Sequence, residues 1–216
     1  MFKKYIKKSR VFSHAAVRSH GTAAAFNETK TELIRKSIHF LIALCPGMAA
    51  VNYNFTVTAL LFGIVFYSAM EVLRVSGVTV PLISSLTYMS SRPGEIGRFV
   101  MGPVTLGAGA LFVLLLFPPP VASIAIFALA FGDGFAGLAG KLLGKHRPAF
   151  LFGKSLEGSL ACLTATYLCA FLVSQNNTVS IAAAITAAAV EALPLEDYDN
   201  IILPVVVGVV VLFLFP

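Results

Sequence analysis

Three residues at the end of one long apolar segment have types and a spacing that suit phosphate chemistry. Asp133, Gly137 and Lys141 are four residues apart, so on an α-helix they share one face, with Asp133 and Lys141 about 12 Å apart along the axis. This distance is too long for a direct ion pair, but it leaves room for a metal-bound phosphate. A carboxylate within a membrane span is costly and by default indicates a functional site. The alternative is that Asp133 only neutralises an Arg or Lys of a neighbouring span.

A stripe of small residues lies beside these three. Gly132, Ala136, Gly140 and Gly144 are also four residues apart, which predicts that another helix approaches closely along this face. The same stretch matches the Gly-x-Gly-x-x-Gly dinucleotide fingerprint over 132–137. Because it ends a long apolar helix instead of following a strand, we reject a dinucleotide site.

The loop that follows is rich in cations and glycine. It contains Lys141, Arg147, Gly153-Lys154-Ser155 and Glu157. Gly-Lys-Ser also occurs in P-loops, but Pro148 stands where that motif needs a glycine, so a soluble P-loop fold is excluded. A new helix is expected to begin here, and its backbone donors and positive end favour an anion. We predict a polyphosphate site formed by Lys141, Arg147, Gly153, Lys154 and Ser155; the alternative is an ordinary positively charged loop.

Ionisable residues also gather at the ends of other apolar segments. The first segment opens with Glu32, Arg35, Lys36 and His39, whose spacing places them on one helix face. The second segment ends with Glu71 and Arg74, three residues apart. Either group is also explained by a simple ion pair at a helix end.

An acidic loop precedes the last apolar segment. It contains Glu191, Asp199 and Asn200. Mg²⁺ takes oxygen ligands and typically uses one or two carboxylates together with substrate phosphates, so this loop predicts a divalent cation. Asp199 and Asn200 are equally consistent with a helix cap.

The elements that must position these residues are transmembrane helices. Of the 216 residues, 57% are hydrophobic and only 12% are charged, about half the charged share of a typical soluble domain. Apolar runs long enough to cross a bilayer recur between short polar breaks. We predict an all-α polytopic membrane bundle of about seven helices, of which the sixth and seventh are short. The predicted spans are 33–51, 55–74, 95–117, 120–142, 158–174, 178–193 and 200–216.

The net charge of +6 belongs to the amino-terminal tail. Residues 1–30 contain seven Lys and Arg and one acid, which predicts a basic cytoplasmic tail ahead of one transmembrane catalytic domain, 31–216; a transit peptide has a similar composition. With the tail inside, every charge of the body falls at or near the cytoplasmic face, where we expect the active site. A basic excess confined to a short tail argues against a nucleic-acid binder.

Together these motifs resemble the family of CTP-dependent lipid kinases that contains dolichol kinase, phytol kinase and the yeast-type diacylglycerol kinase. The resemblance runs in order over about residues 32–204. The matching pieces are Glu32-x-x-Arg35-Lys36-x-x-His39, Glu71, Gly132-Asp133-x-x-Ala136 with Gly140 and Gly144, Gly153-Lys154-Ser155-x-Glu157-Gly158, and Glu191 followed by Asp199-Asn200. It implies an all-helical membrane enzyme that uses Mg²⁺ to move the terminal phosphate of CTP to a lipid alcohol: a polyprenol, a phytol-like alcohol or diacylglycerol.

Roles follow from what phosphoryl transfer requires, which is mainly positioning and charge neutralisation. We expect Asp133 to bind the metal, with Asp199 or Glu157 as the second ligand. Lys141, Lys154 and Arg147 would hold the phosphates, and Glu71 or His39 would accept the proton of the lipid hydroxyl. Supporting roles are expected for Glu32, Arg35, Lys36, Glu191 and Asn200.

Two other functions compete with this interpretation. A cytidylyltransferase uses the same nucleotide and metal but makes a CDP-lipid and pyrophosphate. A transporter would place ionisable groups at several depths and often carries an inverted repeat, whereas here the charges are expected at one face.

Overall fold

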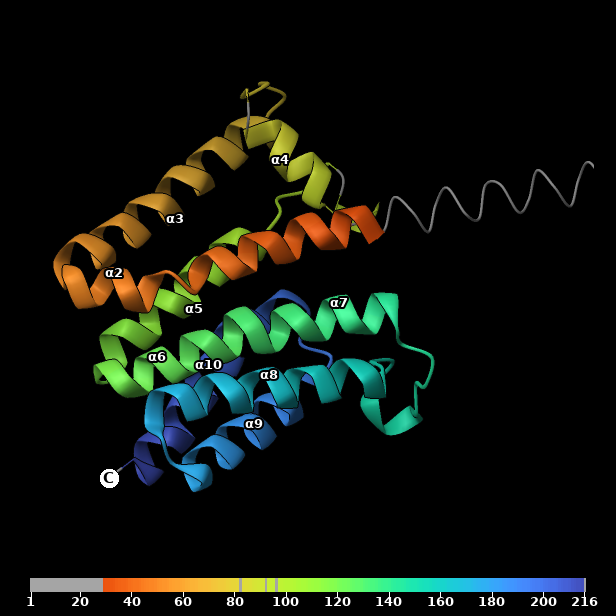
Figure 1. Cartoon of the computed structure of the whole chain (residues 1–216). Coiled ribbons are helices and arrows are strands. Elements are labelled where there is room, and N and C mark those ends of the chain that lie inside the picture. Colours follow the sequence, from red (N-terminus) through yellow and green to blue (C-terminus); the bar gives the residue numbers. More distant parts are fainter. Residues whose placement is uncertain (1–28, 82, 92, 96, 216) are drawn as a thin grey trace, which may run out of the picture.

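The chain folds into helices joined by short loops. The computed structural model describes residues 29–81, 83–91, 93–95 and 97–215 (Figure 1). The predicted tail at 1–30 lies almost entirely outside the described residues. Within the described ranges every regular element is a helix and none is a strand, which confirms the all-α prediction.

The helices follow the predicted spans closely. The first helix covers residues 29–42 and continues after a turn at 43–44 into α2. The elements after this turn are α2 (Cys45–Val51), α3 (Tyr53–Val75), α4 (Ile83–Ser90), η1 (Pro93–Glu95), α5 (Gly102–Leu116), α6 (Pro119–Phe127), η2 (Ala128–Asp133), α7 (Gly134–Leu142), η3 (Ala149–Leu151), α8 (Leu156–Ser174), α9 (Asn177–Glu191), η4 (Glu196–Tyr198) and α10 (Asp199–Leu214).

Several helices have the length and composition of membrane spans, as expected of a multi-pass membrane protein. Five described helical segments qualify: Thr29–Val51, Tyr53–Val75, Pro119–Leu142, Leu156–Ser174 and Glu196–Leu214. Two further apolar helices, α5 and α9, have 15 residues each and would extend only about 22 Å. The structure therefore has five candidate spans where seven were predicted. The third and sixth predicted spans correspond to the short helices α5 and α9, while the seventh, expected to be short, has full length.

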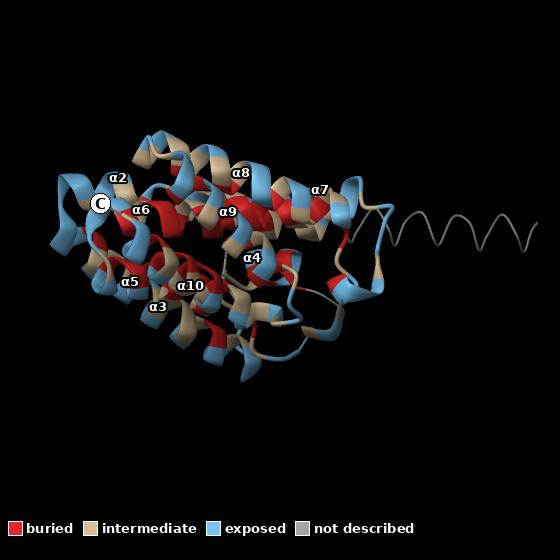
Figure 2. Ribbon diagram, turned by 90° about the horizontal axis from the view of Figure 1, so that it is seen from below, coloured by how far each residue is buried: buried red, intermediate tan, exposed pale blue. Residues whose placement is uncertain are grey.

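Burial divides these helices into a core and a periphery. Figure 2 shows buried residues concentrated on α5, α6, α9 and α10, and the turn η2 is also buried, whereas α3 is mostly exposed. The exposed side chains of α3 include Phe55, Phe62 and Phe66. Such apolar surface suits contact with lipid chains, because a bilayer solvates apolar side chains as a protein core does.

The small-residue stripe packs against α8 as predicted. A Cβ on Gly132 would lie 2.5 Å from Oγ1 of Thr166, and one on Gly140 would lie 3.1 Å from Oγ of Ser155. On the facing helix, a Cβ on Gly158 would lie 2.8 Å from the carbonyl oxygen of Ala136. Small residues on both helices thus allow a close backbone approach.

The central span contains one irregularity that the sequence did not reveal. Between α6 and α7 the chain adopts a π-helical turn, η2, which ends at Asp133. π-Turns inside α-helices often occur at functional sites, because the extra residue changes the direction of the side chains around it. Here the turn leads directly to the only acid of the Pro119–Leu142 segment.

Candidate functional site

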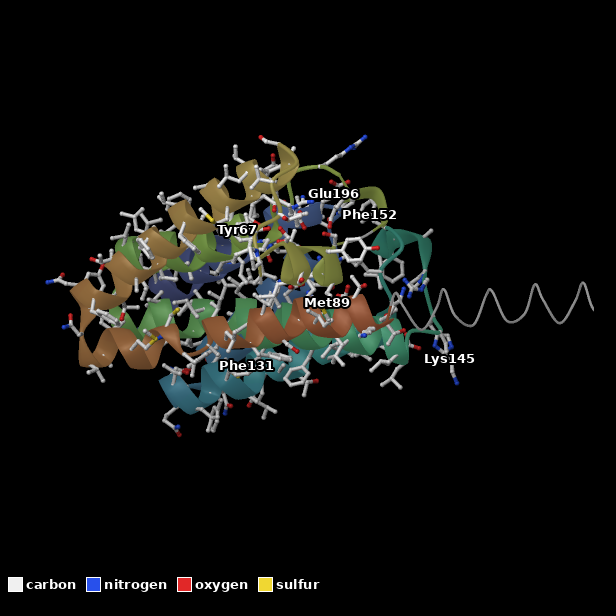
Figure 3. The ribbon with its side chains drawn as sticks, turned by 90° about the horizontal axis from the view of Figure 1, so that it is seen from above. Tyr67, Met89, Phe131, Lys145, Phe152 and Glu196 are labelled. Atoms are coloured by element: carbon white, nitrogen blue, oxygen red, sulfur yellow. The ribbon has the colours of Figure 1, made fainter. Side chains whose placement is uncertain are left out.

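Most of the predicted site residues line one cavity at one end of the bundle. The cavity has a volume of about 350 Å³, within the range of small-molecule sites. It lies between the start of the first helix, α7, the start of α8, the end of α9 and the start of α10. Figure 3 shows Lys145, Phe152 and Glu196, from the loops at this end, gathered on the same side of the molecule. The ionisable residues that line the cavity are Glu32, Arg35, Lys36, Asp133, Lys141, Arg147, Lys154, Glu191, Glu196 and Asp199.

Asp133 forms the centre of a buried cluster with two residues of the first helix. Its Oδ2 accepts a hydrogen bond from Nζ of Lys36 at 2.5 Å. Nδ1 of His39 lies 3.0 Å from the same oxygen. Asp133 and Lys36 are only 4% and 2% exposed. Neutralisation of Asp133 by a neighbouring span, which the sequence left as an alternative, is therefore present, and the pair also lines the cavity.

Gly137 provides the space that this cluster needs. A Cβ at Gly137 would clash with Cε of Lys36 and would lie 2.7 Å from Oε1 of Glu32. The gap between Asp133 and Lys141 therefore receives the Lys36 side chain from another helix. Sequence spacing identified the gap, but it did not identify Lys36 as the cation that enters it.

Lys154 and Glu191 form a second ion pair at the same cavity. Nζ of Lys154 lies 2.8 Å from Oε1 of Glu191. Burial disfavours the ammonium, but the carboxylate of Glu191 outweighs this effect and raises the pKa of Lys154, so this lysine is charged at neutral pH. The other carboxylate oxygen of Glu191, Oε2, is buried and has no hydrogen-bond partner in the structure.

The loop between α7 and α8 is held by its own polar groups. Arg147 donates to the carbonyl oxygens of Gly153 at 2.6 Å and Gly140 at 3.0 Å, so it lines the cavity while closing the loop. Gly153 has a φ of 90°, a conformation that favours glycine. Ser155 caps α8 through its Oγ, which accepts from the amide of Gly158 at 3.1 Å. The predicted helix start is thus at the expected place.

Glu157 does not line this cavity. Its carboxylate accepts from the backbone amides of Lys145 and His146 at 3.2 and 3.3 Å and lies 2.8 Å from Nδ1 of His146. Gly153 does not line the cavity either, and its role is to shape the loop. The structure therefore separates these two predicted site residues from the remainder of the cluster.

Glu71 lies in a separate closed environment. It is fully buried, and its two oxygens accept from Nε and Nη2 of Arg74 at 2.7 Å each. Oε1 also accepts from the amide of Val100 at 2.8 Å. The predicted ion pair with Arg74 is confirmed, and Glu71 lines neither the large cavity nor the small one next to it.

The first helix and α10 supply the supporting residues. Nη2 of Arg35 lies 3.0 Å from Oε1 of Glu32, and Nη1 lies 3.9 Å from Oδ1 of Asp197. Asn200 donates from Nδ2 to Oγ1 of Thr105 at 3.0 Å, so it anchors α10 to α5. The sequence did not predict that Thr105 and Gly102 of α5 belong to the site, because no local pattern shows which α5 residues face it.

The carboxylates of the cavity do not form a ready-made metal cage. In the described part of the chain, no group of three or more His, Cys, Asp or Glu side chains is arranged to hold a metal ion. Asp133, Glu191 and Asp199 nevertheless line the same cavity. One or two carboxylates are what Mg²⁺ typically takes from a protein when phosphates complete its coordination.

Comparison with known proteins gives one partial match. Over 66 residues the chain is 42% identical to a phytol kinase from Synechocystis sp., a stretch that covers 30% of this chain and 28% of that protein. The matched region thus spans less than a third of the relative. No protein-family model and no solved structure matches the chain. The match supports a relationship to a lipid kinase.

Proposed function

We propose that the protein is a membrane lipid kinase that transfers the terminal phosphate of CTP to the hydroxyl group of a lipid alcohol. A polyprenol, a phytol-like alcohol and diacylglycerol are the candidate acceptors, and the reaction takes place at the cytoplasmic face. The observation that carries the proposal is the 350 Å³ cavity, which collects cations and carboxylates from several helices at one end of an apolar bundle. The partial identity to a phytol kinase supports the same reaction class.

The cations of the cavity are suited to hold a polyphosphate. Lys141, Arg147 and Lys154 reach the cavity from the end of α7 and from the following loop. Phosphoryl transfer has a transition state whose charge is spread over phosphate oxygens, so fixed cations stabilise it. The arrangement of these three residues around one space favours a nucleotide over an uncharged ligand.

The carboxylates of the same cavity fit a divalent cation. Glu191 has a buried, unpartnered Oε2, and Asp133 and Asp199 line the same space. One or two of these carboxylates would hold Mg²⁺ together with the phosphates of the nucleotide, and Glu191 takes the place first expected for Glu157. When bound, Mg²⁺ neutralises charge on the phosphate oxygens.

His39 is better placed than Glu71 to accept the proton of the lipid hydroxyl. Nδ1 of His39 lies 3.0 Å from Oδ2 of Asp133, although not in the geometry of a hydrogen bond. The nearby carboxylate favours the tautomer that carries hydrogen on Nδ1. Nε2 is then free of hydrogen and can accept a proton. Both oxygens of Glu71 are already engaged by Arg74.

Labelled nucleotide tests the proposal directly. The purified full chain is reconstituted in lipid vesicles and incubated with Mg²⁺, a panel of lipid alcohols, and CTP or ATP labelled on the terminal phosphate. A kinase transfers the label to the lipid. A cytidylyltransferase releases it in pyrophosphate, and a transporter leaves the nucleotide intact; either outcome would overturn the proposal.

A further inference from the structure

A second, much smaller cavity lies next to the first along the helix of residues 29–42 and shares Arg35 with it. Its volume is about 20 Å³, enough for one water-sized group, which needs roughly 10–15 Å³. The large cavity has about 350 Å³. The small cavity therefore has room for a single hydroxyl group and none for a nucleotide.

The two cavities meet at the buried Asp133 cluster. Arg35 lines both of them. His39 lines the small cavity, while Asp133 lines the large one, and the two side chains approach to 3.0 Å. A hydroxyl group in the small cavity is therefore next to the residues that line the proposed phosphate site.

The small cavity has unpartnered polar atoms at its wall. Oδ1 of Asn200 and Nε of Arg35 are buried and have no hydrogen-bond partner in the structure. Leaving such atoms unpaired costs about 1–3 kcal/mol each, so the wall offers an acceptor and a donor to any hydroxyl that enters. An alcohol O–H satisfies both, because it donates one hydrogen bond and accepts another.

Asn200 is held rigidly in this position. Its Nδ2 bonds to Oγ1 of Thr105, and its backbone packs so closely on α5 that a Cβ on Gly109 would overlap the Asn200 carbonyl oxygen. Pro204, inside α10, lacks the amide hydrogen that would otherwise bond to this carbonyl. The amide oxygen of Asn200 is thus aimed by backbone packing and by one side-chain hydrogen bond.

The remaining wall is partly apolar. Ile38, Val100, Pro103 and Leu106 line the same cavity together with the polar residues Ser90, Glu95 and Asp197. The apolar side chains fit the carbon that carries the hydroxyl of a lipid alcohol. A free phosphate would bring its negative charge next to the carboxylates of Glu95 and Asp197, which disfavours it here.

We propose that the small cavity is the binding site for the acceptor hydroxyl of the lipid alcohol, with Asn200 as a positioning residue. The inference rests on the proposed kinase function. In the reaction the hydroxyl oxygen forms a bond to the terminal phosphorus, and the bond between that phosphorus and the bridging oxygen of the nucleoside diphosphate breaks. The hydroxyl proton passes to Nε2 of His39.

Gly102 allows the small cavity to be filled without disturbing the fold. It lines the cavity, and a Cβ added there would meet only Oδ1 of Asp197, at 3.9 Å, an ordinary contact. We expect Gly102→Ala to raise the KM for the alcohol about tenfold, the usual effect of one methyl group in a filled pocket. The KM for the nucleotide should stay unchanged, because Gly102 does not line the large cavity.

Gly63→Ala is the matched control. Gly63 lies in α3, has nothing within 4 Å of an added Cβ and lines neither cavity, so both KM values should match those of the wild type. Asn200→Leu is a second test, in which the new side chain has a similar size but no polar atoms. Thr105 keeps its hydrogen bonds to the carbonyl oxygens of Met101 and Gly102. This variant should also raise the KM for the alcohol alone.

The outcomes separate the two proposals. If the wild type phosphorylates an alcohol and both variants bind it as well as the wild type does, the small cavity holds only a structural water and the inference is wrong, while the kinase function stands. If the wild type transfers no phosphate to any alcohol in the panel, both proposals fall together.

Discussion

Two buried carboxylates on apolar helices, Asp133 and Glu71, have nearly the same burial and opposite surroundings. Each pairs with a cation: Asp133 with Lys36 at 2.5 Å and Glu71 with Arg74 at 2.7 Å. Asp133 borders a large cavity, whereas Glu71 borders neither cavity. The sequence assigned Asp133 to the metal and named Glu71, like His39, as a candidate to accept the proton of the lipid hydroxyl.

The partners explain the difference. Arg74 is three residues from Glu71 on the same helix and engages both carboxylate oxygens, and the amide of Val100 adds another hydrogen bond. Lys36 comes from a helix 97 positions away in sequence and reaches only Oδ2 of Asp133. The pair of Glu71 and Arg74 is local, uses both carboxylate oxygens, and ties α3 to the segment just before α5. In the long-range pair of Lys36 and Asp133, the carboxylate of Asp133 can still accept contacts from a ligand in the cavity.

The largest expected effect comes from Asp133→Asn. The variant keeps the shape of the side chain but removes the charge, so we expect turnover to fall on the order of 10³-fold or more, as when a charged group of a phosphoryl-transfer site is lost. Transfer of labelled terminal phosphate to lipid measures the loss. Activity near that of the wild type would refute the metal assignment.

A double variant separates this loss from unfolding. Removing one partner of a buried ion pair costs about 3–5 kcal/mol, because Lys36 is left without its carboxylate. In Lys36→Met/Asp133→Asn neither charge remains, so the Tm in detergent should recover toward that of the wild type. Turnover should stay as low as in Asp133→Asn, because the double variant regains stability but still lacks the carboxylate of Asp133.

An intermediate effect is expected from Lys154→Met. The raised pKa of Lys154, caused by Glu191 against the effect of burial, keeps its charge available for phosphate at neutral pH. Loss of one charge-assisted hydrogen bond, about 1.5–3 kcal/mol, should raise the KM for the nucleotide at least tenfold and leave the KM for the alcohol unchanged.

Lys145→Met is the matched control for this variant. Lys145 lies in the same loop but is exposed and does not line the cavity, and Figure 3 places it at the outer end of the molecule. Its replacement should change neither KM. An equal rise in both lysine variants would indicate a general electrostatic attraction of the nucleotide to the loop, instead of a contact made by Lys154.

The smallest effect on activity is expected from Glu71→Gln. Glutamine keeps an acceptor for the amide of Val100 but weakens the pair with Arg74, so the protein should lose about 1–3 kcal/mol of stability and show a lower Tm. Turnover and both KM values should stay at their wild-type levels. A loss of turnover at an unchanged Tm would instead move the proton acceptor from His39 to Glu71 and would reverse the comparison.

Much of the helical architecture could be predicted because each span has its own local signal. Hydrophobic runs bounded by Pro, Gly and polar residues located α3 and α8 to within two residues, and the α6–η2–α7 segment to within one. The error concerned length. The predicted third span began at 95, but Pro93–Glu95 form a short 3₁₀ turn and α5 begins only at Gly102, since local hydrophobicity does not show where a chain stops being helical.

The sequence by itself determined that this is an all-helical chain of membrane-spanning apolar segments and that its charges lie near segment ends, because composition and periodicity are local properties. Only the tertiary structure decided which charges meet. Lys36 enters the gap over Gly137 because the first helix crosses α7 there, and Glu157 turns toward the amides of its own loop. Tertiary packing likewise placed Asn200 against α5, where the small cavity forms. Helix packing brings together residues that are distant in sequence. Which residues meet depends on whole helix interfaces, so no local pattern reveals it.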